Sequence, residues 1–462
     1  MKDQTKAIKR FIIIVAAGIY VVSIAFYLFL LQYPNTSALI KEHIAADFSN
    51  TELANALVVF AIALPIGLAA LLACASVYCI RSYREYKNLG IKRLKKKKPV
   101  KKGKIVRFPA LSALDKKLEK HANARFDTVD TLEKLCVDFQ RYAACEHKLY
   151  YDIKDVRRFI GGMGISRLIL LRGMSGTGKT SLAYVAGEYF ANPSTVVPIQ
   201  PMWKERSDMI GYFNEFTKKF NETTMLCKLY EAGGRQDVFI TVLDEVNIAR
   251  IEYYFAEFLS LLELPEHRRY LDVVSDSWGR DPKRLKGGKL LLPPNMWFVG
   301  TANNDDSTFA ISDKVYDRAA VLDLDKKCSP FVCKPSTACH ISYAELTRLF
   351  NNARSKYRLS EEARYALISL DEYLSQAFRI AIGNRMMGQI ERYVPIMLAC
   401  GATEEEALDD MICRKILRKL EQINPAYVRS MLDDLTACMD RIFGAETLPL
   451  SKEYINKLSK GF

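Results

Sequence analysis

The stretch Gly173-Met-Ser-Gly-Thr-Gly-Lys-Thr180 decides which fold this sequence predicts. An apolar run at 167–171 precedes it and predicts a strand, and residues 181–191 follow with helical character. In this order, backbone N–H groups and the positive end of the helix can surround phosphate oxygens. Lys179 would reach the outer phosphates, and Thr180 would supply a hydroxyl to Mg²⁺. The residues expected to bind nucleotide here are Gly173, Ser175, Gly176, Thr177, Gly178, Lys179, Thr180 and Ser181.

Two later apolar runs end in polar residues that complement this loop. Residues 238–243 lead into Asp244 and Glu245. A buried parallel strand would deliver both carboxylates to its carboxyl edge, where Asp244 would hold Mg²⁺, directly or through water, and Glu245 would polarise the attacking water. Residues 296–300 predict an adjacent strand, and Asn303 beyond it would orient that water. A plain Asn/Asp-rich turn is the alternative for Asn303.

These motifs predict an α/β fold of the P-loop nucleoside triphosphatase type, a parallel sheet flanked by helices, over residues 158–327. Amphipathic stretches punctuated by Gly and Pro predict an α-helical lid over 328–462. Helical spacing also predicts a small helical subdomain over 108–157, whose role the sequence does not indicate. A lid that closes over nucleotide would convert hydrolysis into subunit motion.

Residues 11–31 and 56–80 form two long apolar runs. Each can cross a hydrocarbon core of ~30 Å as a helix, and both exceed the apolar core of a secretory signal. We therefore expect residues 1–80 to form a hairpin of two transmembrane helices, with buried soluble helices as the alternative. Lys and Arg residues precede the first span and follow the second, whereas Lys41 is the single Lys or Arg residue of the intervening loop. This asymmetry predicts a multi-pass membrane protein with both termini and the ATPase domain in the cytoplasm.

The net charge of +14 is concentrated in one segment. Residues 81–107 hold thirteen Lys and Arg residues against a single Glu, which leaves the rest of the chain nearly neutral. We interpret this segment as a basic tether lying against anionic membrane lipid, with a nucleic-acid-binding arm as the alternative. A generalised basic surface for DNA or RNA is excluded.

Eleven cysteines are scattered singly along the chain, which favours a reducing compartment over a disulfide framework. Cys328, Cys333, Cys339 and His340 do cluster, but they lack the paired C-x-x-C spacing of zinc modules. Ordinary loop cysteines are therefore the favoured interpretation, and a zinc site is the alternative.

The chain resembles AAA+ ATPases of the dynein-related type over residues 159–420, and within them the McrB-like NTPases, with the MoxR chaperones as nearby relatives. The resemblance rests on the loop quoted above, Leu243-Asp-Glu-Val-Asn247, Gly300-Thr-Ala-Asn303 and Ser312-Asp-Lys-Val-Tyr-Asp-Arg318. It implies that Asn303 senses the γ-phosphate and that Arg318 is an arginine finger for a neighbouring subunit's nucleotide. Such a finger implies a homo-oligomeric ring, usually a hexamer. Arg385, in the stretch 383–393, resembles the second sensor of the lid.

The sequence also departs from the McrB pattern. Residues 302–307 read Ala-Asn-Asn-Asp-Asp-Ser and lack the Arg of the Met-Asn-x-x-Asp-Arg signature, so we expect ATP as the substrate, with GTP as the alternative. A membrane hairpin stands where McrB proteins carry a DNA-reading domain, so restriction activity does not follow. Trp203 and Tyr212 occupy a region where ring ATPases often place loops facing a pore or partner, although core packing is the favoured role of such aromatics.

Three functions are compatible with these residues. The first is a membrane-anchored AAA+ ATPase that remodels or activates a partner protein, for which the resemblance indicates a nuclease in a restriction or defence system. The second is a nucleic-acid motor or restriction NTPase subunit held at the membrane. The third is a nucleotide-dependent assembly scaffold, against which the pair Asp244 and Glu245 argues because a scaffold needs no hydrolytic carboxylates.

Overall fold

The computed structural model describes residues 106–119, 124–303 and 308–460. These lie in one unit of the chain, residues 104–462. The predicted spans 11–31 and 56–80 and nearly all of the tether 81–107 lie outside the described residues. Within the described ranges, no helix is both long and apolar enough to cross a bilayer.

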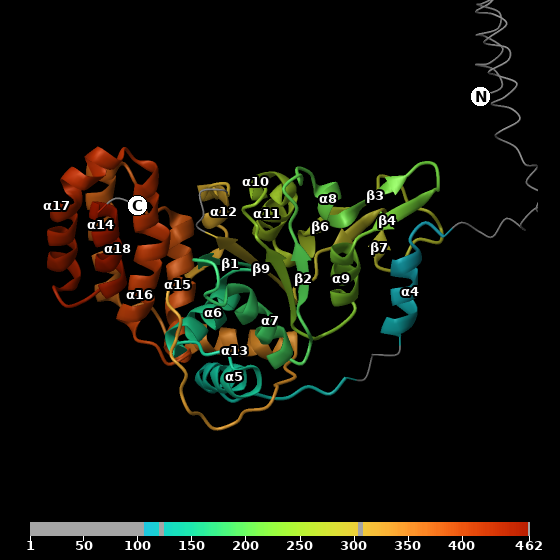
Figure 1. Cartoon of the computed structure of the whole chain (residues 1–462), viewed down its shortest axis with the longest axis horizontal. Helices are drawn as coiled ribbons and strands as arrows, with labels where there is room; N and C mark the ends of the chain where they lie inside the picture. Colours follow the sequence, from blue (N-terminus) through green and yellow to red (C-terminus); the bar gives the residue numbers. More distant parts are fainter. Residues whose placement is uncertain (1–105, 120–123, 304–307, 461–462) are drawn as a thin grey trace, which may run out of the picture. The chain divides into compact units, whose positions relative to one another are not determined.

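A five-stranded parallel sheet forms the centre of the α/β core, in the order β10-β1-β9-β5-β2, and Figure 1 labels β1, β9 and β2 of this sheet. Its strands are β1 Leu168–Gly173, β2 Thr195–Pro198, β5 Phe239–Asp244, β9 Met296–Asn303 and β10 Ala320–Asp323. Leu168 and Leu170 pack into one hydrophobic cluster, whereas Ile169 and Leu171 pack into a second. Because side chains alternate along a strand, an all-apolar strand is buried on both faces. The predicted α/β fold with a parallel sheet is therefore present.

Helices cover both faces of this sheet. One cluster includes residues of α5 Leu132–His147, α6 Ile153–Ile165, α7 Lys179–Tyr189 and α13 Tyr343–Lys356. The other includes residues of α4 Pro109–Leu118, α8 Arg206–Ile210, α9 Thr224–Ala232, α10 Ile251–Tyr254, α11 Ala256–Glu263 and α12 Asp313–Tyr316. Helices α4 and α5, both expected in the helical subdomain 108–157, thus contribute to different clusters.

Short antiparallel strands contribute residues to the cluster that contains α4 and α8 to α12. They form a hairpin of β3 Gly211–Asn214 and β4 Lys219–Glu222, and a three-stranded sheet of β6 Tyr270–Asp272, β8 Lys289–Leu291 and β7 Leu285–Lys286, which follows the 3₁₀-helix η1 Glu266–Arg268. Phe216 lies in the turn between β3 and β4 and is 99% exposed. Trp203 is half-buried and makes an edge contact with Tyr254, which agrees with a packing role, whereas Tyr212 on β3 is 56% exposed.

Arg107, which the sequence assigns to the basic tether, belongs to the folded body. Its side chain is 4% exposed and lies against the rings of Phe213 and Trp278, with the guanidinium carbon 4.8 and 4.7 Å from their centroids. It also forms ion pairs with Asp276 at 2.6 Å and Asp281 at 3.7 Å. This arginine therefore cannot face lipid headgroups, because its charge is already paired inside the protein.

The C-terminal helices form a third hydrophobic cluster of their own, which begins at Leu359. They are α14 Glu361–Phe378, α15 Asn384–Ala399, α16 Glu404–Met411, the π-helix η2 Ile412–Ile416, the 3₁₀-helix η3 Leu417–Gln422, α17 Pro425–Phe443 and α18 Pro449–Lys460. Side-chain caps begin α14, α16 and α17, and the cap of α16, Thr403, forms a capping box with Glu406. In Figure 1 they are the orange and red helices, with η2 in contact with the edge strand β10. Helix α13 packs on the core instead, and the domain bounds 328–462 stay a prediction.

Candidate nucleotide-binding site

The phosphate-binding loop joins β1 to α7, as the sequence predicts. Gly173 has a φ of +141°, and a Cβ there would lie 2.5 Å from the Leu324 carbonyl oxygen. Gly178 has a φ of +93° and immediately precedes the helix, so glycine is required at both positions. Lys179 is 6% exposed, and its ammonium donates hydrogen bonds to the carbonyl oxygens of Gly173 at 2.9 Å and Met174 at 2.7 Å. The lysine charge therefore lies inside the loop that would hold the phosphates.

The metal-binding residues predicted from separate motifs meet at the sheet edge. The Thr180 hydroxyl donates to Oδ1 of Asp244 at 2.9 Å, which joins the first turn of α7 to the end of β5. The hydroxyl of Thr301 on β9 donates to the same oxygen at 2.8 Å. Hydroxyl and carboxylate oxygens are the ligands that Mg²⁺ prefers, alone or through water. The donor set thus fits the expected Mg²⁺.

Glu245 lies in a strained turn directly after β5. It is exposed and has a φ of +57°, a left-handed conformation that costs energy for a residue with a Cβ. Thr301 holds this turn twice: its Oγ1 accepts from the Glu245 N–H at 2.9 Å, and its carbonyl accepts from the Val246 N–H at 2.8 Å. One buried threonine therefore fixes both carboxylate-bearing residues.

Asn303 reaches the same edge on β9, which lies between β1 and β5. It pairs in register with Gly173 at the start of the phosphate-binding loop. Buried Asn247 donates through Nδ2 to the Asn303 carbonyl at 2.8 Å and to the Thr308 hydroxyl at 2.9 Å. The strand order thus places Asn303 between the loop and the acidic pair, while residues 304–307 lie outside the described residues.

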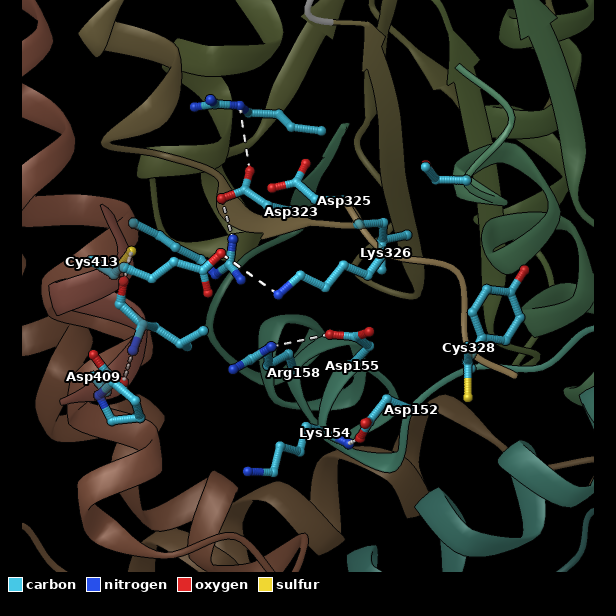
Figure 2. Close-up of a pocket in the computed structure, with 18 of the residues that line it drawn as sticks. Asp152, Lys154, Asp155, Arg158, Asp323, Asp325, Lys326, Cys328, Asp409 and Cys413 are labelled. Carbon is cyan, nitrogen blue, oxygen red and sulfur yellow. Dashed lines mark hydrogen bonds and ion pairs between the residues drawn. The ribbon is translucent and has the colours of Figure 1, made fainter. Parts of the chain in front are cut away.

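A cavity of about 1000 Å³ adjoins the loop at Gly176, Thr177, Gly178 and Ser181. The Tyr151 hydroxyl, from the segment between α5 and α6, lines this cavity and donates to the Gly178 carbonyl at 3.0 Å. Figure 2 shows the charged residues that surround the cavity: Asp152, Lys154, Asp155, Arg158, Asp323, Asp325, Lys326 and Asp409, together with Cys328 and Cys413. Ligand cavities span ~300–1000 Å³, so this one has room for a nucleoside beside the phosphates.

Asp323 connects the loop strand to the C-terminal helices across this cavity. Its register partner on β1 is Arg172, whose Nε lies 3.5 Å from the carboxylate, and buried Arg414 of η2 forms a second ion pair with it. Burial opposes ionisation, but Arg414 and Arg172 outweigh it and lower the pKa of Asp323. The carboxylate therefore stays ionised and links β10 to η2.

The structure places Arg318 and Arg385 together, away from this cavity. Arg318 Nε lies 2.9 Å from Glu263 at the end of α11, and Arg385 on α15 lies 3.0 Å from the same carboxylate. Among the described residues that line the cavity, neither arginine is present. The predicted finger and second sensor thus share one partner, and a contact of Arg385 with its own subunit's nucleotide stays a prediction.

Comparisons with known proteins add limited information. Residues 339–462 match the family model described as "Domain of unknown function (DUF8727)". A provisionally assigned ATPase of Cytophaga hutchinsonii is similar in structure, with a TM-score of 0.41, 14% identity, and coverage of 71% of this chain and 96% of that one. A full-length MCM homologue of Methanopyrus kandleri has a TM-score of 0.35 and 11% identity, and the match covers 62% of this chain and 61% of that one. No curated protein matches significantly. Both structural similarities are weak, and the site geometry stands without them.

The residues of the cysteine cluster lie in different surroundings. Within the described part of the chain, no three His, Cys, Asp or Glu side chains converge on a common point. Cys333 Sγ lies 2.7 Å from Cys145 Sγ, and His340 Nε2 lies 2.9 Å from Asp237 Oδ1. Cys328 lines the cavity beside the loop instead. Cys328 and Cys333 thus have different surroundings, and the choice between loop cysteines and a zinc site stays a prediction.

Sequence reasoning missed several residues that shape the site. Thr301 and Asn247 lie inside recognisable motifs, so their positions beside Asp244 and Asn303 could have been inferred from the parallel register. Tyr151 is different, because it contacts the loop from a segment with no motif.

Proposed function

We propose that this chain is a Mg²⁺-dependent nucleoside triphosphatase of the AAA+ type, with ATP as the expected substrate and GTP as the alternative. The observation that carries the proposal is the 2.9 Å hydrogen bond between Thr180 and Asp244. It joins the phosphate-binding loop to the acidic strand at the edge where Glu245 and Asn303 also lie. The three motifs thereby form one site.

Each residue has a defined task in this proposal. Lys179 and the loop N–H groups bind the β- and γ-phosphates, and Thr180 and Asp244 would hold Mg²⁺, which supplies charge neutralisation on those phosphates when bound. Glu245 accepts a proton from the water that attacks the γ-phosphorus, and Asn303 orients that water. The bond between the γ-phosphorus and the bridging oxygen breaks, and the nucleoside diphosphate and phosphate leave.

The proposal includes a ring, for which a hexamer is expected. Its support is that Arg318 and Arg385 converge on Glu263 instead of on their own subunit's cavity. The side chain of Arg385 is also 57% exposed, which leaves it accessible to another subunit. Arg318 would then serve a neighbour's nucleotide, where a finger can contribute 10³–10⁵-fold to hydrolysis, as a typical order of magnitude.

The biological setting remains a proposal based on the sequence alone. Two apolar runs and the basic segment support a membrane anchor with the ATPase in the cytoplasm, where hydrolysis would remodel or activate a partner protein. A nuclease of a restriction or defence system is the partner class that the McrB resemblance suggests. A nucleic-acid motor at the membrane is the alternative, and salt-dependent DNA binding that disappears when the lysine run 95–98 is neutralised would favour it.

The test is hydrolysis by the purified full-length protein with Mg²⁺ and either ATP or GTP. We expect Glu245→Gln to lower kcat about 10²–10⁴-fold while nucleotide binding persists, because only the proton acceptor is lost. Lys179→Ala should abolish binding, and mass photometry should show a nucleotide-dependent ring. Undiminished turnover by Glu245→Gln would refute the catalytic assignment. A monomer in every nucleotide state would refute the ring.

A further inference from the structure

Arg318 lies in a short segment whose backbone carbonyls accept hydrogen bonds from side chains of the C-terminal helices. Lys415, on the π-helix η2, is 2% exposed, and its ammonium donates to the carbonyl oxygens of Tyr316 and Ala319. These two carbonyls lie on either side of Arg318 in the sequence. A single buried cation therefore fixes the backbone from which the proposed finger projects.

Two more side chains hold the same segment. Arg418, on η3, is 3% exposed, forms an ion pair with Asp313 at the start of α12, and lies 3.7 Å from the centroid of the Tyr316 ring. Gln389 of α15 donates to the Asp317 carbonyl at 2.7 Å. Residues of the lid-like helices thus form hydrogen bonds or ion pairs with both ends of the segment from 313 to 319.

The residue next to Lys415 faces the nucleotide cavity instead. Arg414 lines the cavity and pairs with Asp323, which Figure 2 shows between two cationic groups, and with Asp410. A π-helix is rare and occurs frequently at functional sites, since its extra residue per turn changes which side chains face each neighbour. Here consecutive residues of η2 contact the cavity wall and the Arg318 segment.

Burying these cations carries an energetic cost that packing alone does not require. An apolar side chain of similar size would fill the same space without desolvating an ammonium or guanidinium group. Burial also lowers the pKa of Lys415 to about 7. A lysine at this buried position is explained if the hydrogen bonds from its side-chain nitrogen to the carbonyls around Arg318 are needed.

We propose that Lys415 and Arg418 are positioning residues for Arg318, and that η2 couples the state of a subunit's own cavity to the arginine it offers its neighbour. This inference rests on the proposed function, in which Arg318 acts on a neighbouring nucleotide. A change at Arg414 when the cavity fills would reach Arg318 through one peptide unit and the bonds of Lys415.

A mixed-subunit experiment with full-length protein tests the proposal. The donor subunit carries Glu245→Gln, so it cannot hydrolyse nucleotide but keeps Arg318. The acceptor carries Arg318→Ala and keeps its catalytic residues. Mixing them should restore ATP hydrolysis above that of either alone, because donors lend arginines to acceptor sites. Failure of this starting pair would overturn the finger in trans and the positioning role, whereas the hydrolysis proposal is tested separately by Glu245→Gln.

Lys415→Met is then placed in one partner at a time. In the donor we expect it to reduce the restored activity on the order of tenfold or more, within the 10³–10⁵-fold range of an arginine finger. In the acceptor, which has no finger to position, the restored activity should persist. General destabilisation would reduce activity equally in both placements, and that outcome, or no loss in the donor, would overturn the positioning role.

Two further variants complete the design. Arg418→Met in the donor removes the ion pair and the ring contact and should reproduce the donor-specific loss, which keeps the test decisive if Lys415→Met fails to fold. Lys419→Met, a half-buried lysine on the same element, is the matched control and should leave complementation unchanged in either partner. A loss with Lys419→Met equal to that with Arg418→Met would also contradict the proposal.

Discussion

Replacing Thr301 with valine tests whether one hydrogen-bonded side chain sets the geometry of both carboxylates. The substitution keeps the shape of a side chain whose residue is 2% exposed. It removes the 2.8 Å bond to Asp244 and the 2.9 Å acceptor of the Glu245 N–H. An unpaired buried donor costs roughly 1–3 kcal/mol, and a hydrogen bond to a charged group is worth about 1.5–3 kcal/mol. We expect the free energy of unfolding to fall by about 2–4 kcal/mol.

The catalytic effect should be larger than the stability effect implies. Glu245 is held at a φ of +57° against its own preference, and Thr301 supplies two of the bonds that hold the turn. If the carboxylate moves by about 1 Å, the rate can fall on the order of 10²-fold. We therefore expect kcat to drop about 10²-fold while KM for MgATP changes little, because Lys179 and the loop are untouched.

The assays are steady-state ATP hydrolysis and urea denaturation of the same preparations. Thr301→Ser keeps the hydroxyl and should recover most of kcat. Thr241→Val makes the same change at a buried threonine of β5 and is the matched control. A normal kcat for Thr301→Val, with or without lost stability, would refute the argument that this residue positions Glu245.

Three other predictions concern the rest of the molecule. Below about pH 7 Lys415 is charged in both the folded and unfolded states, and above about pH 7 the folded state alone loses the proton. The free energy of unfolding should therefore rise by about 1.5 kcal/mol from pH 7 to about 8.5. Urea titrations of Lys415→Met should lack this rise. Arg107→Ala should lower the free energy of unfolding by about 3 kcal/mol in denaturant titrations, because Asp281 is left buried without its partner. With diamide as the oxidant, Cys145 and Cys333 should form a disulfide with loss of two hydrogens, detected by peptide mass spectrometry, because their sulfurs lie 2.7 Å apart; Cys328 should stay unlinked.

The sheet edge could be predicted because its geometry leaves little freedom. The carboxyl ends of the strands in a parallel sheet lie at one edge. Asp244, Glu245 and Asn303, which end or follow apolar strands, could therefore be placed near Thr180 from the sequence. The phosphate-binding loop could also be predicted from its three glycines, Gly173, Gly176 and Gly178, all of which have positive φ values where a residue with a Cβ would be strained.

Charge and helix patterns were less informative because they do not specify partners. Arg107 ends a run of lysines and reads as part of a solvated tether, yet its partners Phe213 and Asp276 lie far along the chain. Buried Arg414 and Lys415 read as ordinary charged positions of an amphipathic helix, since nothing local marks the π-helical turn that directs them inward. Long-range packing decides such residues, and the sequence pattern does not encode it.

Arg318 and Arg385 show where transfer by motif ends. A motif can assign a residue type to a helix start or a lid, but it cannot state which nucleotide the side chain meets, because that depends on how helices outside the sheet are placed. Glu263 gives a physical criterion: it draws both guanidinium groups to one carboxylate at the end of α11. If each arginine served a different nucleotide, one of them would have to break its ion pair with Glu263 while the other kept it. The two arginines therefore need separate tests: the activity lost in Arg318→Ala should be restored by a subunit that lends its own Arg318, whereas the loss in Arg385→Ala, as a second sensor of its own subunit's lid, should not be restored by a neighbour.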